Sequence, residues 1–317
     1  MPDHPGPPSP TPDPLGDALH LLRLTGTLYC RAELTAPWSI AMPAFDGCMA
    51  LVVVTSGRGV LQVEGAPPRA LEAGSITLVP HGVPHTLHDG QGGAPVPLFD
   101  IPVEQVSERY EIMRYGGGGE AALALYGVVR LDHPTGRRLV AHLPEVLHTG
   151  AWDDDGWLAG TVRLIAREAA ALRPGGETVL TRLADVLVVQ AIRAWLDASP
   201  LARQGWLAAL RDEHVGRALA LIHRDPARPW TVAALAHASG LSRSSFSARF
   251  TGLVGEPVGQ YLTSLRLALA HALLQDSPDP LQTIARRVGY QSEAAFSRAF
   301  RRAYAASPGS LRRPPTP

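Results

Sequence analysis

Three histidines and two cysteines are the residues of this chain that could bind a metal ion or undergo redox chemistry. They are His81, His85 and His88, together with Cys30 and Cys48. Because zinc prefers imidazole and thiolate ligands, a metal site at His85 completed by a cysteine is one hypothesis. The alternative, which we favour, is that His85 is a hydrogen-bonded interior histidine and that the cysteines are buried apolar residues. A disulfide would need their Cα atoms within about 7 Å, which sequence spacing does not decide.

A second set of residues with chemical potential is the group of arginines in the last third of the chain. All 29 basic residues are arginines, and 29 acidic residues cancel them. The two kinds are unevenly distributed, because residues 205–317 carry 14 arginines against 7 acidic residues. A basic segment on a neutral chain is typical of a module that binds a polyanion.

The elements that position these residues follow from length and periodicity. A chain of 317 residues exceeds what one core usually supports. Between residues 26 and 115 short apolar runs alternate with Gly and Pro turns, which predicts a small β-barrel or sandwich. Beyond residue 150 the apolar spacing is helical. We therefore predict an α+β multidomain protein with a disordered tail over residues 1–12, a β-barrel domain over 13–150, a helical connector over 151–205 that could form a dimer interface, and an all-α domain over 206–317.

The predicted all-α domain contains an internal repeat. Gly240 matches Gly289 at an offset of 49, and Phe246 and Phe250 match Phe296 and Phe300 at an offset of 50. Each copy indicates a helix, a glycine turn and a second helix whose phenylalanines share one face. The repeat predicts two helix-turn-helix motifs, over residues 230–251 and 279–302. The expected N-cap residues are Thr231, Ser242, Asp279 and Ser292.

The helix faces opposite the phenylalanines carry small, hydroxyl and arginine side chains, which suit a major groove of DNA. Arg298 could contact a guanine, whereas Arg243, Arg249 and Arg302 lie nearer the flanks and suit phosphates. The alternative is that these arginines only solvate a helical surface. We favour DNA binding over it, because the motif that carries them occurs twice. The predicted DNA-binding residues are Arg243, Ser244, Ser247, Arg249, Glu293, Ser297, Arg298, Arg301 and Arg302. A helix over 257–275, about 28 Å long, would hold the two motifs roughly one DNA turn (~34 Å) apart.

This repeat resembles the DNA-binding domain of the AraC/XylS family of bacterial transcription regulators. The resemblance covers residues 206–313 and is carried by Leu235-Ala236, Gly240-Leu241-Ser242, Phe246-Ser247, Arg266-Leu267, Ile284-Ala285, Gly289-Tyr290, Phe296-Ser297-Arg298 and Ser307-Pro308. It implies a regulator that binds double-stranded promoter DNA with both motifs and activates transcription by contacting RNA polymerase. The first recognition helix departs from the family by presenting mostly Ser and Ala, so DNA shape could replace base contacts there.

The spacing of Gly74, Pro80, Gly82, His85 and Asp89 resembles the second cupin motif, with Asp89 in place of the usual Asn. Over residues 13–150 the chain is similar to the cupin sensor domain of one branch of the AraC family. This resemblance implies a domain that senses a small-molecule or redox effector. The homodimer that we expect rests on the two amphipathic helices predicted over 157–196. Cupin enzymes hold a metal with an HxH pair and a Glu of the first motif, but residues 45–59 contain no His and no Glu.

The missing first-motif ligands argue against the alternative function, a cupin metalloenzyme fused to a DNA-binding module. We expect no enzymatic activity and no cofactor, apart from the metal considered at His85. The sequence also lacks a signal-peptide pattern and a continuous apolar run long enough to span a membrane. We therefore expect a cytoplasmic protein without a membrane partner.

Overall fold

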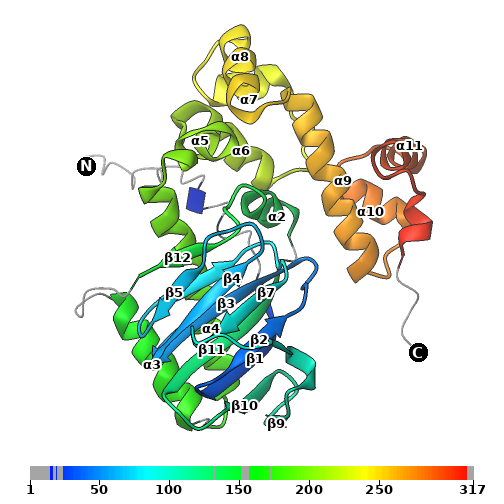
Figure 1. The fold of residues 1–317 in the computed structure, drawn as a ribbon. Coiled ribbons are helices and arrows are strands. Elements are labelled where there is room, and N and C mark those ends of the chain that lie inside the picture. The colour runs from blue at the N-terminus through cyan, green and yellow to red at the C-terminus, as the bar shows by residue number, and fades with distance from the viewer. Residues whose placement is uncertain are drawn as a thin grey trace, which may run out of the picture. The chain divides into compact units, whose positions relative to one another are not determined.

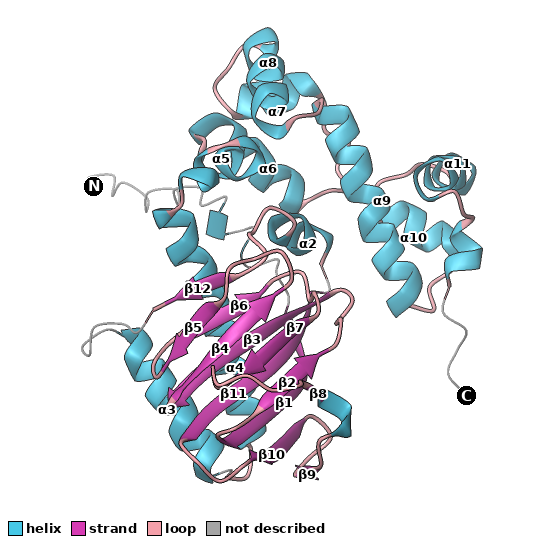
Figure 2. Ribbon diagram, viewed as in Figure 1, coloured by secondary structure: helices cyan, strands magenta, loops and turns pink. Residues whose placement is uncertain are grey.

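The computed structural model describes residues 15–16, 19, 24–131, 133–150, 157–171 and 173–312. The predicted tail over residues 1–12 lies outside these ranges. The chain divides into two compact units, with the main boundary between Ser199 and Pro200. We call them the N-terminal unit and the C-terminal unit. Figure 2 shows the strands gathered in the former, while the latter is helical.

The N-terminal unit contains two sheets (Figure 1). The seven-stranded sheet has the order β12-β6-β3-β11-β1-β10-β9 and consists of β1 (Leu24–Thr35), β3 (Cys48–Ser56), β6 (Ile76–Val79), β9 (Val103–Gln105), β10 (Tyr110–Gly116), β11 (Ala121–Leu131) and β12 (Leu147–Thr149). The five-stranded sheet has the order β5-β4-β7-β2-β8 and consists of β2 (Ser39–Met42), β4 (Arg58–Val63), β5 (Arg69–Glu72), β7 (His85–His88) and β8 (Val96–Pro97). A short helix, α2 (Pro134–Val140), follows β11.

The core of this unit lies between the two sheets. β4 alternates buried and outward residues, and its buried Leu61 and Val63 belong to the same apolar cluster as Val52 of β3 and Tyr126 of β11. Alternation of this kind is what a strand with one buried face shows. The prediction of a sheet-rich domain is confirmed. Its closed barrel is not, because the described strands pair as two separate sheets with free edges rather than as one continuous ring.

Two long helices pack against the seven-stranded sheet, α3 (Trp157–Ala171) and α4 (Gly176–Ala198). Arg31 of β1 and Tyr110 of β10 both donate to the carbonyl of Ala169, at 3.2 and 3.3 Å. The helices therefore cover the sheet face turned away from the core, and six consecutive residues of β3 are buried as a result. The helical periodicity predicted for this connector is confirmed. Of the helices that the structure describes, none is both long enough and apolar enough to cross a bilayer.

The C-terminal unit is helical beyond Pro200. It contains α5 (Gly205–Arg211), α6 (Glu213–Arg224), α7 (Val232–Ala238), α8 (Arg243–Val254), α9 (Val258–Asp276), α10 (Leu281–Arg287) and α11 (Glu293–Tyr304), and the short turn η3 (Pro308–Leu311) is the last element among the described residues. The helix predicted over 257–275 corresponds to α9. It separates two helix pairs, α7 with α8 and α10 with α11 (Figure 1). We call them the first and the second helix pair.

The two pairs share the same local hydrogen bonds. In the first, the amide of Leu241 donates to the carbonyl of Ala236 at 3.0 Å, and in the second the amide of Tyr290 donates to Ala285 at 2.9 Å. These bonds close the turns at Gly240 and Gly289, which both have positive φ. The sequence repeat at an offset of 49 is thus also a structural repeat.

Three of the four predicted N-caps are confirmed. Thr231, Ser242 and Ser292 each accept a hydrogen bond from the amide three residues later, at 3.1–3.2 Å. The prediction for Asp279 is wrong, because α10 starts at Leu281 and the extended Pro280 takes the cap position without a side-chain bond. Oδ2 of Asp279 instead accepts from Nη1 of Arg287 at 2.6 Å. This ion pair links Asp279, just before α10, to Arg287 at the end of the same helix, and it takes the place of a capping hydrogen bond.

Candidate functional sites

The second helix of each pair exposes one face because its phenylalanines bury the other. Phe246 and Phe250 of α8 are 0% exposed, as are Phe296 and Phe300 of α11. Their rings pack in tilted pairs with centroids 5.7 Å apart in α8 and 5.5 Å in α11. This aromatic anchoring sets the rotation of each helix about its axis, and therefore which residues face solvent.

The residues predicted to bind DNA lie on these solvent-facing surfaces. Seven of the nine are exposed, namely Arg243, Ser244 and Arg249 on α8, and Glu293, Arg298, Arg301 and Arg302 on α11. Ser247 and Ser297 occupy equivalent half-buried positions beside the phenylalanines. Among these residues α11 therefore presents three exposed arginines and α8 presents two. Both surfaces can contact the sugar-phosphate backbone and the base edges of a groove.

Arg249 is held by an acidic residue that the sequence pattern did not single out. Its Nε donates to Oδ1 and Oδ2 of Asp212 at 3.1 and 3.0 Å, and its Nη2 donates to Oδ2 at 2.5 Å. Asp212 also caps α6 by accepting from the amides of His214 and Val215. Burial acts to raise the pKa of Asp212, but the hydrogen bonds from Arg249 and the two amides outweigh it and lower the pKa overall. Arg249 thus ties α8 to the start of α6.

The three candidate histidines lie in different environments. His85 is 4% exposed, and because a carbonyl only accepts, its Nδ1 donates to the Val83 carbonyl at 2.8 Å. Its Nε2 then accepts from the hydroxyl of Tyr126 at 3.1 Å. Burial lowers the pKa of His85, so the ring is neutral at neutral pH. His81 is exposed and bonds the Leu143 carbonyl, whereas His88 accepts from the amide of Gly90.

The residues around His85 do not fit a metal ion. Both of its ring nitrogens already have protein partners. In the parts of the chain that the structure describes, no three His, Cys, Asp or Glu side chains come together in a way that could hold a metal. Val52 and Val54, within the segment where the first cupin motif would supply ligands, line an apolar cavity instead. The geometry supports the interpretation of His85 as a hydrogen-bonded interior histidine.

The two cysteines lie on opposite sides of β11. Cys30 of β1 is opposite Tyr126, and Cys48 of β3 is opposite Arg130. Four residues along a strand amount to about 13 Å, well beyond the ~7 Å limit between the Cα atoms of a disulfide. Cys30 is 3% exposed, and burial, assisted by the carboxylate of Glu111, raises the pKa of its thiol to about 12. A protonated, buried thiol is a poor nucleophile, so the geometry supports the apolar role.

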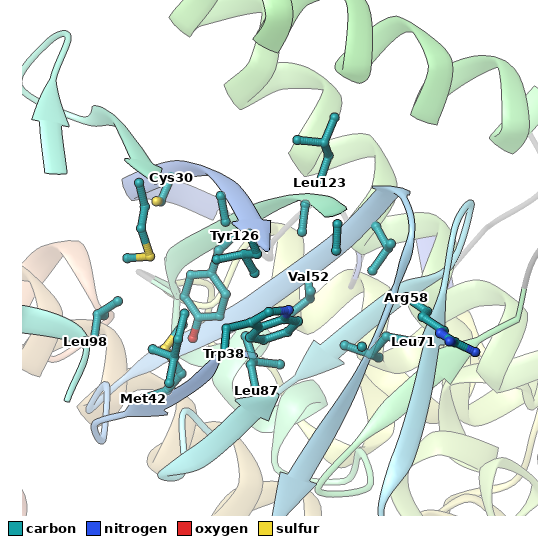
Figure 3. A pocket seen from close by; sticks show the side chains of 18 of the residues that line it. Cys30, Trp38, Met42, Val52, Arg58, Leu71, Leu87, Leu98, Leu123 and Tyr126 are labelled. Atoms are coloured by element: carbon teal, nitrogen blue, oxygen red, sulfur yellow. The ribbon is translucent and has the colours of Figure 1, made fainter. Parts of the chain in front are cut away.

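A cavity between the two sheets is a feature that the motifs did not predict. Tyr126 and Trp38 lie near the middle of the side chains that line it, which come from both sheets (Figure 3). Its wall is almost entirely apolar, with a volume of about 40 Å³. The labelled residues in Figure 3 are Cys30, Trp38, Met42, Val52, Arg58, Leu71, Leu87, Leu98, Leu123 and Tyr126. We call this space the inner cavity. It suits a slender apolar group, and a wider one would require side chains to move.

A larger and more polar pocket of about 460 Å³, which we call the outer pocket, adjoins the inner cavity. The residues that line both include Trp38, Arg58 and Leu71. Arg58 pairs with Glu120 at 3.0 Å, and both side chains are largely exposed. The cupin-motif residue Asp89 accepts from the backbone amide of Trp38 at 3.0 Å and so holds the backbone of the residue whose side chain lines both spaces. The outer pocket can accommodate a polar group whose apolar part enters the inner cavity.

Comparison with known proteins places both units in described families. Residues 13–197 match the family model described as Cupin, and residues 235–314 match the model described as Helix-turn-helix domain. An AraC-like transcription regulator of Streptomyces antibioticus is 31% identical over 313 residues, covering 96% of this chain and all of the relative. Another from Streptomyces lividans is 33% identical over 306 residues, covering 96% and 99%. Among solved structures, the DNA-binding domain of AdpA in complex with a target DNA is 29% identical over 31% of this chain and 88% of that domain, with a TM-score of 0.30.

Proposed function

The chain belongs to the AraC-like transcription regulators, and we propose that it reads promoter DNA with two helix-turn-helix motifs, one in each helix pair. It is a DNA-binding regulator with a cupin-family N-terminal region, and the family is one of regulators rather than enzymes. The observation that supports two reading units is the structural repeat. The same backbone bonds, serine caps and buried phenylalanines recur in α7–α8 and α10–α11.

In this proposal α8 and α11 enter successive major grooves on one side of the duplex. The 19 residues of α9 span about 28 Å, compatible with the ~34 Å of one DNA turn. Arg298 contacts a base, while Arg243, Arg301 and Arg302 contact phosphates. Because Asp212 holds Arg249, we propose that Arg249 positions α8 and does not itself contact DNA.

The N-terminal unit takes a small-molecule effector that is partly apolar. The inner cavity supports this assignment, because its wall is formed by side chains such as Val52, Met42 and Leu87. A polar group of the effector would lie in the outer pocket near Arg58. The separation of Cys30 from Cys48 makes a small molecule a better-supported effector than a disulfide-forming oxidant.

Two further parts of the proposal concern partners. The chain forms a homodimer through α3 and α4, where Leu164, Val179 and Val186 are exposed although apolar. Exposed apolar side chains on neighbouring helices are a common feature of subunit interfaces. Activation through contact with RNA polymerase rests on family membership alone.

The proposed DNA reading is tested by selecting binding sites from random-sequence duplexes with the purified full-length protein. We expect enriched sites with two short conserved segments separated by about one helical turn. Arg298→Ala should remove the preference at one position, and Arg69→Ala serves as the control because it removes the same charge from an exposed position of β5 in the N-terminal unit. Selection that enriches no sequence would contradict the proposal.

A further inference from the structure

The loop between α6 and α7, residues 225–230, accepts three hydrogen bonds from one side chain of α9, Arg266. Nε of Arg266 donates to the carbonyl of Pro226 at 2.7 Å. Its Nη2 donates to the carbonyls of Ala227 and Arg228 at 3.3 and 2.8 Å. A guanidinium holds its donors in a rigid planar fork, so three carbonyls together fix both its position and its orientation. Arg266 thereby ties the linker helix to the entrance of the first helix pair.

This loop is itself held by internal contacts. Oδ1 of Asp225 accepts from the amide of Arg228 at 3.2 Å, and the indole of Trp230 donates to the Asp225 carbonyl at 2.8 Å. The guanidinium of Arg228 lies 4.3 Å above the Trp230 ring, within the range of a cation–π contact. The loop is therefore an ordered platform rather than a spacer between two helices.

The second helix pair rests on the same platform. A Cβ atom added to Gly289 would lie 2.6 Å from the Ala227 carbonyl oxygen and 2.9 Å from Cζ of Arg266. The equivalent Gly240 of the first pair also has positive φ, but a Cβ there meets nothing within 4 Å. The turn alone thus explains Gly240, whereas Gly289 is also required for the close approach of the second helix pair to the 225–230 loop and to Arg266.

We propose that Arg266, Gly289 and the 225–230 loop form a joint that fixes α11 relative to α8 and makes DNA recognition depend on the spacing between the two half-sites. This inference rests on the proposed reading of DNA by both pairs. Inserting one base pair rotates one half-site by about 34° and moves it by about 3.4 Å. A rigid joint cannot follow that displacement. Arg266 is therefore a positioning residue, which affects recognition without touching the bases.

The test compares spacing variants of a selected site. The wild-type full-length protein first selects sites from random duplexes, and the preferred site is then remade with one base pair inserted or deleted between its half-sites. We expect the wild type to lose at least about tenfold in affinity on either change, as for the loss of a good base contact. Arg266→Ala should bind the original site more weakly but lose less than about threefold on insertion, with Arg266→Lys in between. Arg286→Ala, at an exposed position of α10, removes the same charge and should keep the wild-type ratio.

The ratio between the spaced and original sites is the decisive readout, because a general loss of charge or stability would weaken binding to all probes alike. Gly289→Ala provides an independent test and should also relax the spacing requirement, whereas Gly240→Ala should not. If thermal unfolding shows that Arg266→Ala does not fold, Gly289→Ala still tests the proposal. If both Arg266→Ala and Gly289→Ala keep the wild-type ratio, the joint is refuted. A wild type that selects a single half-site refutes it as well, whereas one that selects no sequence refutes the proposed function itself.

Discussion

Replacing Tyr126 by phenylalanine should destabilise the N-terminal unit by about 1–3 kcal/mol, although the change removes a single oxygen atom. The Tyr126 hydroxyl donates to Nε2 of His85 at 3.1 Å, and each residue is only 4% exposed. Phenylalanine would leave Nε2 as a buried acceptor without this partner, and the cost is the desolvation of that nitrogen. Packing should change little, because the aromatic ring keeps its place on the cavity wall.

The same pair predicts a pH dependence with a definite sign. Burial lowers the pKa of His85 below its ordinary value of 6.5. Below about pH 6.5 the unfolded chain therefore binds a proton that the folded chain does not, and the free energy of unfolding falls as the pH decreases toward the folded pKa. His85→Phe should remove this part of the slope. The double variant His85→Phe/Tyr126→Phe removes both partners and should cost less than the sum of the single changes.

Hydrogen exchange measured by mass spectrometry on peptides of β7 and β11 reports the stability of this unit separately from that of the C-terminal unit. Tyr115→Phe is the matched control, since Tyr115 lies half-buried on β10 of the same sheet as β11, and we expect it to change the stability by less than about 0.5 kcal/mol. Wild-type exchange in Tyr126→Phe, or strictly additive costs in the double variant, would refute the assignment of this hydrogen bond.

Three further predictions concern other parts of the chain. Arg298→Ala should cost about 1–3 kcal/mol of binding free energy and relax the preference at one base pair, measured by titrating single-base variants of a selected site; an equal loss on all sequences would identify a phosphate contact instead. Asp212→Asn should keep the N-cap of α6 but weaken the contact with Arg249. Asp212→Ala should lose the cap as well and reduce the stability by a further ~1 kcal/mol. Equal hydrogen exchange of the α6 amides in the two variants would contradict the capping role. Iodoacetamide at neutral pH should alkylate the partly exposed Cys48 before the buried Cys30, whose thiol has its pKa raised to about 12, and peptide mass spectrometry would detect the reverse order.

The helical repeat was predictable because its signals are local. A glycine that ends a helix, a serine that caps the next and phenylalanines four residues apart act within about ten residues, so Gly240, Ser242 and Phe246 indicate their own conformations. Asp279 shows where local reasoning fails. Its expected cap depended on the register of a single turn, and the carboxylate instead pairs with Arg287 at the other end of α10.

The inner cavity was not predictable in the same way. Its wall combines residues of β2, β4, β7, β10 and β11, which no sequence spacing brings together. The motif around His85 did indicate an inward-facing histidine, but its partner Tyr126 lies 41 residues further along the chain. Asp212 and Arg249 are likewise 37 residues apart, so their ion pair follows from the packing of α6 against α8 and not from either local pattern.

The two proposed recognition helices, α8 and α11, differ in the exposed arginines that they present, and this difference makes the joint at Arg266 and Gly289 important. Of the exposed arginines on α8, Arg249 is already engaged by Asp212, while α11 presents Arg298, Arg301 and Arg302 to solvent. Direct readout should therefore be stronger in the second pair, and the first should act more through backbone contacts and DNA shape. A weakly discriminating unit adds specificity only when it is held at a fixed distance and rotation from a strong one, because otherwise it binds whatever sequence lies within reach. Arg266 and Gly289 supply that constraint, so residues that touch no base should decide how much the first helix pair contributes to the choice of promoter.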